Sequence, residues 1–263
     1  KVITMKYFFD TEFHERIKKP WFGKKYHLME LISIGIVDED GRTYYAVSSD
    51  FDLKAAWNNE WLRDNVLYPI YKELRDIQNE SVGERLIYGH LWQFFSYKSL
   101  KVLISWHGKN NELIAAEIFD FVNPDLGFHI TGYNNSEFRD SQSSNSLHFE
   151  KHNVTDIKEH FYAQPEFYAY YADYDWVLLC SLFGSMMDLP PGFPMYCKDL
   201  KQYKDQAAEN VVYMVDKDKT KEAKLIVIES QKDYPLNNNE HNALSDAKWN
   251  YKLYKFLKTL IQL

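Results

Sequence analysis

Two carboxylates near the start of the sequence have the spacing of a shared chemical task. Asp10 and Glu12 directly follow the β-rich run Met5–Phe9 and lie two residues apart. On a β-strand, side chains at this spacing leave the same face, so the two negative charges repel each other unless a positive charge binds between them. Hard divalent cations such as Mg²⁺ prefer carboxylate oxygens of this kind. The pair therefore indicates a metal site, with a solvated turn as the alternative.

Two later segments place further titratable residues at the beginnings of helices. An aromatic run leads into Asp173 and Asp175, just before an apolar helical segment. Either acid has an ordinary helix cap as its alternative role. His241 and Asp246 stand at the head of the last predicted helix, five residues apart, which corresponds to about 140° around a helix. They can share one site only if His241 lies in the loop before the helix, and the polar run 237–239 favours such a loop.

The combination of these signals in this order is more informative than any one of them. An Asp-x-Glu pair on the first strand, a later Asp at a helix start and a final His-x4-Asp resemble the pattern of the DEDDh 3′–5′ exonucleases, the DnaQ-like branch of the ribonuclease-H-like fold. Within that branch the sequence is most similar to the bacterial polyadenylate-specific 3′–5′ exoribonucleases. The segments that carry the resemblance are Tyr7–Phe13, Glu30–Gly35, Gly41–Ser48, Leu189–Pro191 and His241–Ala247. The family pattern places the middle acid next to the helix, which favours Asp175 over Asp173.

The resemblance implies an enzyme with five functional residues. Asp10, Glu12, Asp175 and Asp246 would be the acidic ligands of two divalent ions, Mg²⁺ or Mn²⁺, and His241 would be the general base. The implied reaction is hydrolysis of single-stranded RNA from its 3′ end, which releases nucleoside 5′-monophosphates. Bound metals would also explain how a chain with a net charge of −7 acts on a polyanion.

Four residues within the segments that carry the resemblance are candidates for contact with the substrate. Phe13 and Leu31 offer apolar contact with the terminal base, and a place in the core is the alternative for both. Glu30 and Ser33 offer hydrogen bonds to the sugar or the base. The preference for RNA rests on the resemblance, because the sequence does not reveal a contact to the 2′-hydroxyl. The resemblance further implies a homodimer.

Two other functions remain open from the sequence. One is the same chemistry on DNA, as a 3′–5′ exonuclease in repair or proofreading. The other is a catalytically inactive nucleic-acid-binding module of the same fold, although the presence of all five catalytic-type residues counts against it.

The elements that must position these residues alternate between strands and helices. Three runs predict antiparallel strands, at Met5–Phe9, Leu28–Asp38 and Thr43–Ser49, and the last two are joined by a turn at Asp40-Gly41. Lys54–Ile77 has helical spacing, and Pro69 either breaks this helix or lies in the first turn of a second one. The remaining predicted elements are a helix at Asn110–Val122, a strand at Glu166–Ala172, a helix at Trp176–Met187 and a closing helix at Ala243–Leu260. This order predicts an α/β fold: a ribonuclease-H-like mixed sheet with three antiparallel N-terminal strands flanked by helices.

We predict a single exonuclease domain over residues 1–263 with two insertions. The polar, turn-rich stretch at 125–160 is expected to be an inserted loop. Residues 205–235 are expected to form a second insertion, a β-hairpin built from the apolar runs Val211–Val215 and Leu225–Ile228.

The composition is that of a globular protein. Hydrophobic residues make up 45% of the 263 residues and charged residues 26%, which is enough to bury a core. No apolar run approaches the roughly 18 residues of a membrane span, so no membrane partner is expected. The first residues lack the pattern of a signal peptide, and the two cysteines, Cys180 and Cys197, do not form a disulfide framework, so we expect a cytoplasmic location. Aromatic residues reach 17%, and we interpret most of them, including Trp61, as core or interface residues.

Overall fold

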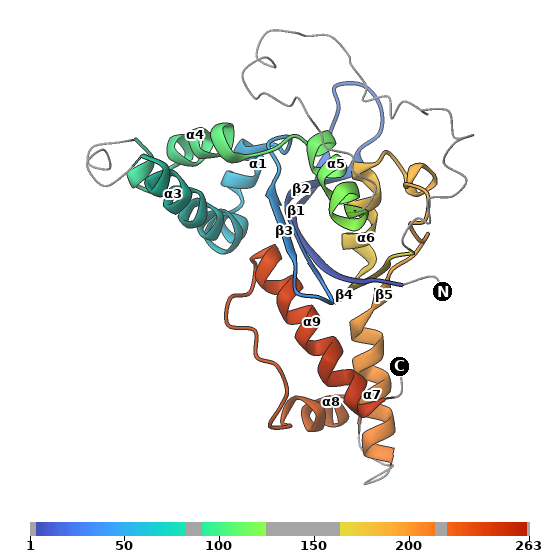
Figure 1. The fold of residues 1–263 in the computed structure, drawn as a ribbon. Helices are drawn as coiled ribbons and strands as arrows, with labels where there is room; N and C mark the ends of the chain where they lie inside the picture. The colour runs from blue at the N-terminus through green and yellow to red at the C-terminus, as the bar shows by residue number, and fades with distance from the viewer. Residues whose placement is uncertain (1–3, 83–90, 125–163, 214–219, 262–263) are drawn as a thin grey trace.

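A five-stranded sheet forms the centre of the molecule (Figure 1). The computed structural model describes residues 4–82, 91–124, 164–213 and 220–261. In the order β3-β2-β1-β4-β5, the first three strands are antiparallel, and β4 and β5 continue the sheet in parallel. The strands are β1 (Lys6–Lys18), β2 (Tyr26–Asp38), β3 (Thr43–Val47), β4 (Glu166–Ala169) and β5 (Lys198–Asp199). The structure thus confirms the predicted mixed sheet with three antiparallel strands, and the arrangement is compatible with the ribonuclease-H-like fold.

The first strand is much longer than the sequence predicted. We expected it to end at Phe9, but β1 continues to Lys18 because β2 pairs with it along its whole length. Asp10 and Glu12 therefore lie within the strand rather than beyond its end. The register shifts between Glu12 and Phe13, and such a bulge bends the strand next to the acidic pair.

The two faces of the sheet are covered by different helices. Helices α5 (Asn111–Val122) and α6 (Asp173–Leu182) pack on the face that carries Tyr7, Phe9 and Ile34. Helix α9 (Ala243–Leu260) covers the opposite face and contributes Leu253 and Leu257 to a second cluster. The amide of Asn250 on α9 donates a hydrogen bond to the carbonyl oxygen of Phe9 at 2.9 Å, which anchors this helix to β1.

A separate group of short helices stands beside the β3 edge (Figure 1). It consists of α1 (Leu53–Asn58), α2 (Glu60–Leu62), a π-helical turn (Arg63–Leu67), α3 (Tyr68–Val82), a 3₁₀ turn (Leu91–Gln93) and α4 (Tyr97–His107). Pro69 lies in the first turn of α3, where its missing N–H is tolerated. A core that includes Val66, Leu67 and Leu103 holds the group together.

The region predicted as a second β-hairpin is helical instead. Helices α7 (Leu200–Tyr213) and α8 (Lys221–Glu229) occupy it, followed by the loop that leads to α9. The prediction was wrong because a short apolar run such as Leu225–Ile228 does not distinguish a strand from one buried turn of a helix. Ala207 and Ala208 on α7 and Ile228 on α8 are buried in the cluster that α9 completes.

Two further predictions from the sequence concern the insertion and the absence of membrane spans. The predicted insertion at 125–160 lies outside the described residues. In the described part of the chain, no helix has both the length and the hydrophobicity needed to cross a membrane. The remaining short element is a 3₁₀ turn at Met186–Asp188 that follows α6.

Candidate metal and catalytic site

One pocket brings together acids from the beginning, the middle and the end of the chain. Its volume is about 280 Å³. Asp10 and Glu12 reach it from β1, Asp175 from the first turn of α6, and Asp246 from the first turn of α9. His241 lines the same pocket. All five residues singled out from the sequence thus border one cavity.

Three of the acids have the geometry of a cation site. One carboxylate oxygen from each of Asp10, Glu12 and Asp246 can be chosen so that all three lie within 4.8 Å of one another. Within the described part of the chain, the pocket lining contains no lysine or arginine. Oxygen ligands that converge without a balancing positive charge fit a hard divalent cation.

Burial and mutual repulsion disfavour the charged forms of these acids in the protein alone. The pKa of Asp10 is raised well above its ordinary value, first by burial and then by the charges of Asp175, Glu12 and Asp246. Burial raises the pKa of Glu12 to about 8, with Asp246 and Asp175 adding to the effect. A bound cation would remove the repulsion and favour the ionised forms.

Asp175 is held in place by the strand that carries the first two acids. Its Oδ1 accepts hydrogen bonds from the Thr11 amide at 2.9 Å and from the Thr11 hydroxyl at 2.5 Å. Burial raises the pKa of Asp175 to about 6, although the bonds from Thr11 lower it. Asp173, in the same turn of α6, is exposed. The structure therefore places Asp175, and not Asp173, beside the other acids.

Asp246 is positioned by the residues that begin α9. Its Oδ2 accepts a hydrogen bond from the backbone amide of His241 at 2.9 Å, and its Oδ1 accepts one from the side chain of Asn237. The helix itself is capped by Asn242, whose side chain accepts a hydrogen bond from the amide of Ser245 at 3.0 Å. The loop and the helix start therefore form one structure around this carboxylate.

A glycine in β2 allows α9 to approach the acids. A Cβ atom at Gly35 would lie 2.4 Å from backbone atoms of Ala243 and of Leu244. Gly35 pairs with Asp10 in the β1–β2 register. The absence of a side chain at this position therefore lets the start of α9, and with it Asp246, lie directly over the acidic strand.

His241 lies in the turn just before α9. This is the position that we expected if His241 and Asp246 share one site. Its backbone φ is +65°, in the left-handed region that side chains rarely adopt. Its ring and the ring of Trp61 from α2 meet edge to face, with 4.8 Å between the centroids and an angle of 75° between the planes. Trp61 is 52% exposed. From the sequence we interpreted this tryptophan as a core or interface residue. Its contact with His241 was not predicted, because the two residues are far apart in the chain.

The four candidate substrate contacts fall into different environments. Phe13 lines the pocket and meets Tyr174 edge to face, with 5.7 Å between the ring centroids. Leu31 and Ser33 are buried, Leu31 within the core between the sheet and α5 and α6, and Ser33 opposite Glu12. Glu30 is half-buried and accepts hydrogen bonds from the guanidinium of Arg16 at 2.8 and 3.0 Å.

Three tyrosines were missed by the sequence reasoning. Tyr170, Tyr171 and Tyr174 also line the pocket, where β4 leads into α6. Tyr171 and Tyr174 are 64% and 48% exposed. The high density of aromatic residues in this segment was the one feature of the sequence that could have indicated their role. Exposed rings beside a cluster of acids provide surfaces on which a nucleobase can stack.

Comparisons with known proteins point to one class of enzyme. No family model matches the chain. Two curated proteins from two strains of Mycobacterium tuberculosis are each 27% identical to it over 198 residues, which cover 75% of this chain and 73% of each relative. Both of those proteins are named 3′–5′ exoribonuclease.

Proposed function

We propose that the protein is a metal-dependent 3′–5′ exoribonuclease of the DEDDh type, which removes nucleoside 5′-monophosphates from the 3′ end of single-stranded RNA. The observation that carries the proposal is the convergence of Asp10, Glu12, Asp175, Asp246 and His241 on one pocket. The similarity to proteins named 3′–5′ exoribonuclease supports RNA as the substrate. A homodimer and a cytoplasmic location belong to the same proposal.

The four carboxylates would hold two divalent ions, Mg²⁺ or Mn²⁺. Asp10, Glu12 and Asp246 supply oxygens that already converge, and Asp175 borders the same space with one oxygen bound to Thr11. When bound, the ions would offset the charge of the scissile phosphate and make water more acidic. The protein's own contribution is to fix these oxygens on two helix starts and one strand, so that little reorganisation is needed.

His241 would accept the proton of the attacking water through a ring nitrogen. The ring lines the pocket, its backbone is tied to Asp246, and Trp61 limits its movement from the side of α2. A base held in this way would stay within reach of the reacting phosphate.

The aromatic wall would receive the terminal nucleotide. Phe13 and Tyr174 meet edge to face at the rim of the pocket, and we propose that the terminal base stacks near them. Such stacking requires an unpaired base, which explains a preference for single strands. Because Leu31 and Ser33 are buried and Glu30 is bound to Arg16, we assign the base contact to Phe13 first.

Digestion of labelled oligonucleotides tests the proposal. We expect 5′-labelled oligoadenylate to be shortened from its 3′ end with Mg²⁺ or Mn²⁺, and to stay intact in EDTA. Shortening of DNA alone would instead favour the repair or proofreading enzyme, and binding without shortening would favour the inactive module.

A pair of variants on one helix turn tests the assignment of the site. Asp175→Asn should abolish shortening, because it removes a charge from the pocket, whereas the matched Asp173→Asn variant should retain it, because Asp173 is exposed. Circular dichroism would establish that both variants are folded. Full activity of Asp175→Asn would contradict the assignment.

A further inference from the structure

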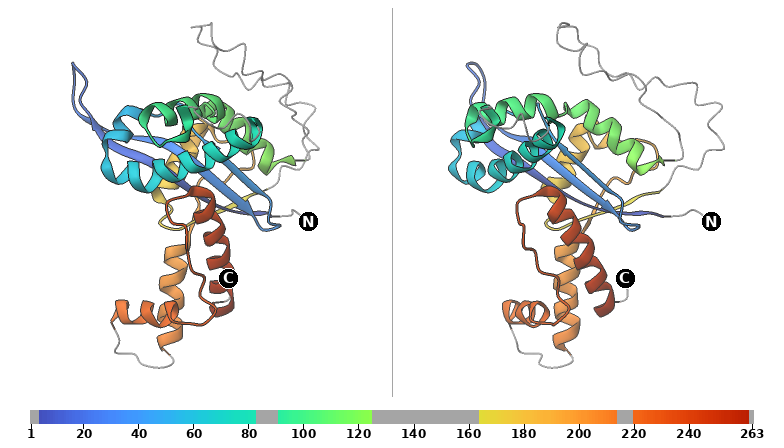
Figure 2. Two further views of the ribbon diagram at one scale, coloured as in Figure 1. Left: turned by 90° about the vertical axis from the view of Figure 1, so that its left-hand side faces the viewer. Right: turned by 60° about the vertical axis from the view of Figure 1, so that its left-hand side comes forward.

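The turn between β1 and β2 exposes two aromatic rings at the end of a long hairpin. Trp21 and Phe22 are 94% and 81% exposed. Their ring centroids are 5.2 Å apart and their planes are tilted by 39°. Both views of Figure 2 show the hairpin, in blue, projecting past the neighbouring helices. Neither ring contributes to the hydrophobic clusters of the described residues, so folding alone does not account for them.

The same turn concentrates positive charge in a chain that is negative overall. Residues 17–26 contain four lysines and no aspartate or glutamate, whereas the whole chain has a net charge of −7. The lysines are exposed, and they flank the two rings: Lys18, Lys19, Lys24 and Lys25. Within the described part of the chain, the ion pairs near this turn involve Arg16 and His27 rather than these lysines. We call Trp21, Phe22 and the four lysines the hairpin tip.

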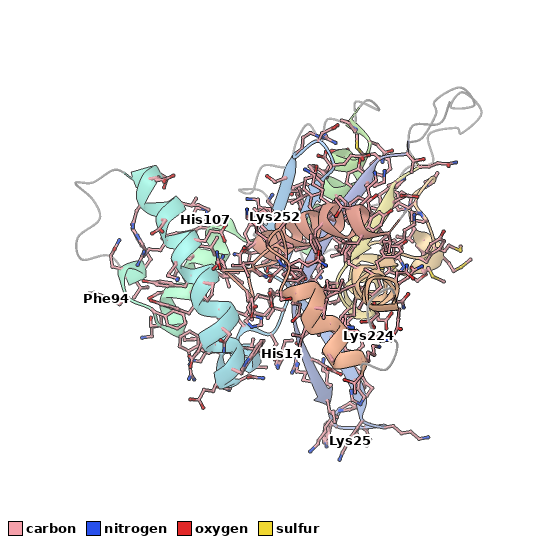
Figure 3. The ribbon with its side chains drawn as sticks, turned by 90° about the horizontal axis from the view of Figure 1, so that it is seen from below. His14, Lys25, Phe94, His107, Lys224 and Lys252 are labelled. Carbon is pink, nitrogen blue, oxygen red and sulfur yellow. The ribbon has the colours of Figure 1, made fainter. Side chains whose placement is uncertain are left out.

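The hairpin tip is connected to the acidic pocket by a single strand, β1, which bends at the register shift next to Glu12. Glu12, in the pocket, and Lys18, at the base of the tip, both belong to β1. The six residue steps from Glu12 to Lys18 span about 20 Å at the usual rise of a strand, which corresponds to at most about six nucleotides of a stacked single strand. In Figure 3 the labelled Lys25 lies at the far end of this hairpin, with the labelled His14 between it and the body of the molecule.

We infer that the hairpin tip is a second RNA-binding site, which holds the single strand several nucleotides upstream of the 3′ end that occupies the pocket. This inference rests on the proposed exoribonuclease function. Exposed rings beside lysines match the two features that single strands offer, bases for stacking and phosphates for ion pairing. The distance along β1 makes the site useful only to an RNA that is long enough to reach from the pocket to the tip.

The length of the RNA therefore provides the test. The double variant Trp21→Ala/Phe22→Ala should raise KM for a 20-nucleotide oligoadenylate by about 10- to 100-fold, since each stacked base contributes substantially to affinity. For a three-nucleotide oligoadenylate, the same variant should change kcat and KM by less than about twofold, because an RNA of this length does not reach from the pocket to the tip. Replacement of the four lysines by glutamine should make KM for the long RNA less dependent on salt, by about 0.7 in logarithmic slope for each phosphate that the tip no longer binds.

Matched controls come from the helical group beside β3. Phe94 is 80% exposed and is labelled far from Lys25 in Figure 3, and Lys98 and Lys101 are exposed on α4. The variants Phe94→Ala and Lys98→Gln/Lys101→Gln should leave the kinetics of both RNAs unchanged. An equal effect of the tip variant on both lengths, or no effect on either, would overturn the inference. So would a change of oligomeric state in sedimentation, which would make the tip a contact between two copies of the chain.

A binding measurement separates this inference from the proposed function. If the wild-type protein shortened no RNA, the proposed function would fail, and the affinity of a fluorescent 20-nucleotide oligoadenylate would still report on the tip. Fluorescence anisotropy should then show a Kd that rises about 10-fold or more in Trp21→Ala/Phe22→Ala. An unchanged Kd would overturn the inference.

Discussion

Alternate residues of β1 belong to two regions with opposite physical character. Tyr7 and Phe9 point into an apolar core, where Phe9 meets Phe167 and Trp176 edge to face. Asp10 and Glu12 point to the other face, where acids converge and where burial, followed by the charges of neighbouring acids, raises the pKa of both. The aromatic cluster is complete when the chain folds, whereas the acidic cluster leaves carboxylates close together with no balancing lysine or arginine in the pocket lining of the described residues.

This difference shows how the fold divides stability from chemistry. Burial of the aromatic face stabilises the sheet. The acidic face costs free energy in the absence of a cation, because carboxylates are buried close to one another. A substitution in the aromatic cluster should therefore change stability and leave catalysis, and a substitution in the acidic cluster should do the reverse.

The largest effect is expected on the acidic face. Asp10→Asn should lower kcat on oligoadenylate by at least about 10⁴-fold, or ~5 kcal/mol in activation free energy, because it removes one of the proposed metal ligands. The same variant should be as stable as the wild type or more stable in EDTA, because it removes a repelled charge. Single-turnover kinetics measure the rate of cleavage, and urea unfolding measures the free energy of unfolding. A loss of stability without a loss of activity would contradict the division between stability and chemistry.

On the apolar face the expected pattern is reversed. Phe9→Ala should lower the free energy of unfolding by about 3–5 kcal/mol, because it leaves a cavity among Phe167 and Trp176. The kcat of this variant, calculated per folded molecule, should equal that of the wild type. Urea unfolding followed by tryptophan fluorescence tests the first statement, and activity per folded molecule tests the second; a specific loss of kcat above about tenfold would argue against it.

A smaller effect is expected where the two regions are joined. Gly35→Ala should cost about 2–3 kcal/mol of unfolding free energy, since the new Cβ meets backbone of α9 that cannot move aside easily. It should also weaken activity, because α9 carries Asp246. Gly41→Ala is the control: its site has open space and a φ of +90°, so about 1 kcal/mol is expected with no effect on activity. Equal effects at both glycines would contradict the close approach of α9.

The smallest effect is expected from pH in EDTA. The folded protein raises the pKa of Glu12 to about 8 and of Asp175 to about 6, so it binds protons more tightly than the unfolded chain does. The stability from this difference is present at low pH and is lost as pH rises through these values. Between pH 5 and 9, we expect Tm to fall by roughly 2–6 °C. The double variant Asp10→Asn/Glu12→Gln should make Tm less dependent on pH, and so should the addition of Mg²⁺. A Tm that rises between pH 5 and 9 would contradict the account.

The sequence predicted the elements best where local signals agree. The closing helix was predicted at Ala243–Leu260 and has these bounds, because Asn242 caps it and its apolar residues recur with helical spacing. The helix at residues 111–122 was found for the same reasons, with Asn110 as its cap. The hairpin turn at Gly41 also agrees with its φ of +90°.

Where pairing partners decide the structure, the local signals failed. The polar residues after Phe9 looked like the end of a strand, but pairing with β2 continues it to Lys18. Helix α4 had no counterpart among the predicted elements. The contact between Trp61 and His241 depends on how the helical group packs against the sheet, which no local pattern contains. The convergence of Asp10, Asp175 and Asp246 was expected from a family resemblance, since spacing along the chain does not show which distant segments meet.

The location of a bound metal tests the central claim most directly, namely that separate parts of the chain form one cation site. Crystals grown with Mn²⁺ and measured at an energy where manganese scatters anomalously would show where the ion binds. We predict an anomalous peak in contact with oxygens of Asp10, Glu12 and Asp246. A fully occupied Mn²⁺ elsewhere on the protein, with no peak among these three carboxylates, would contradict it.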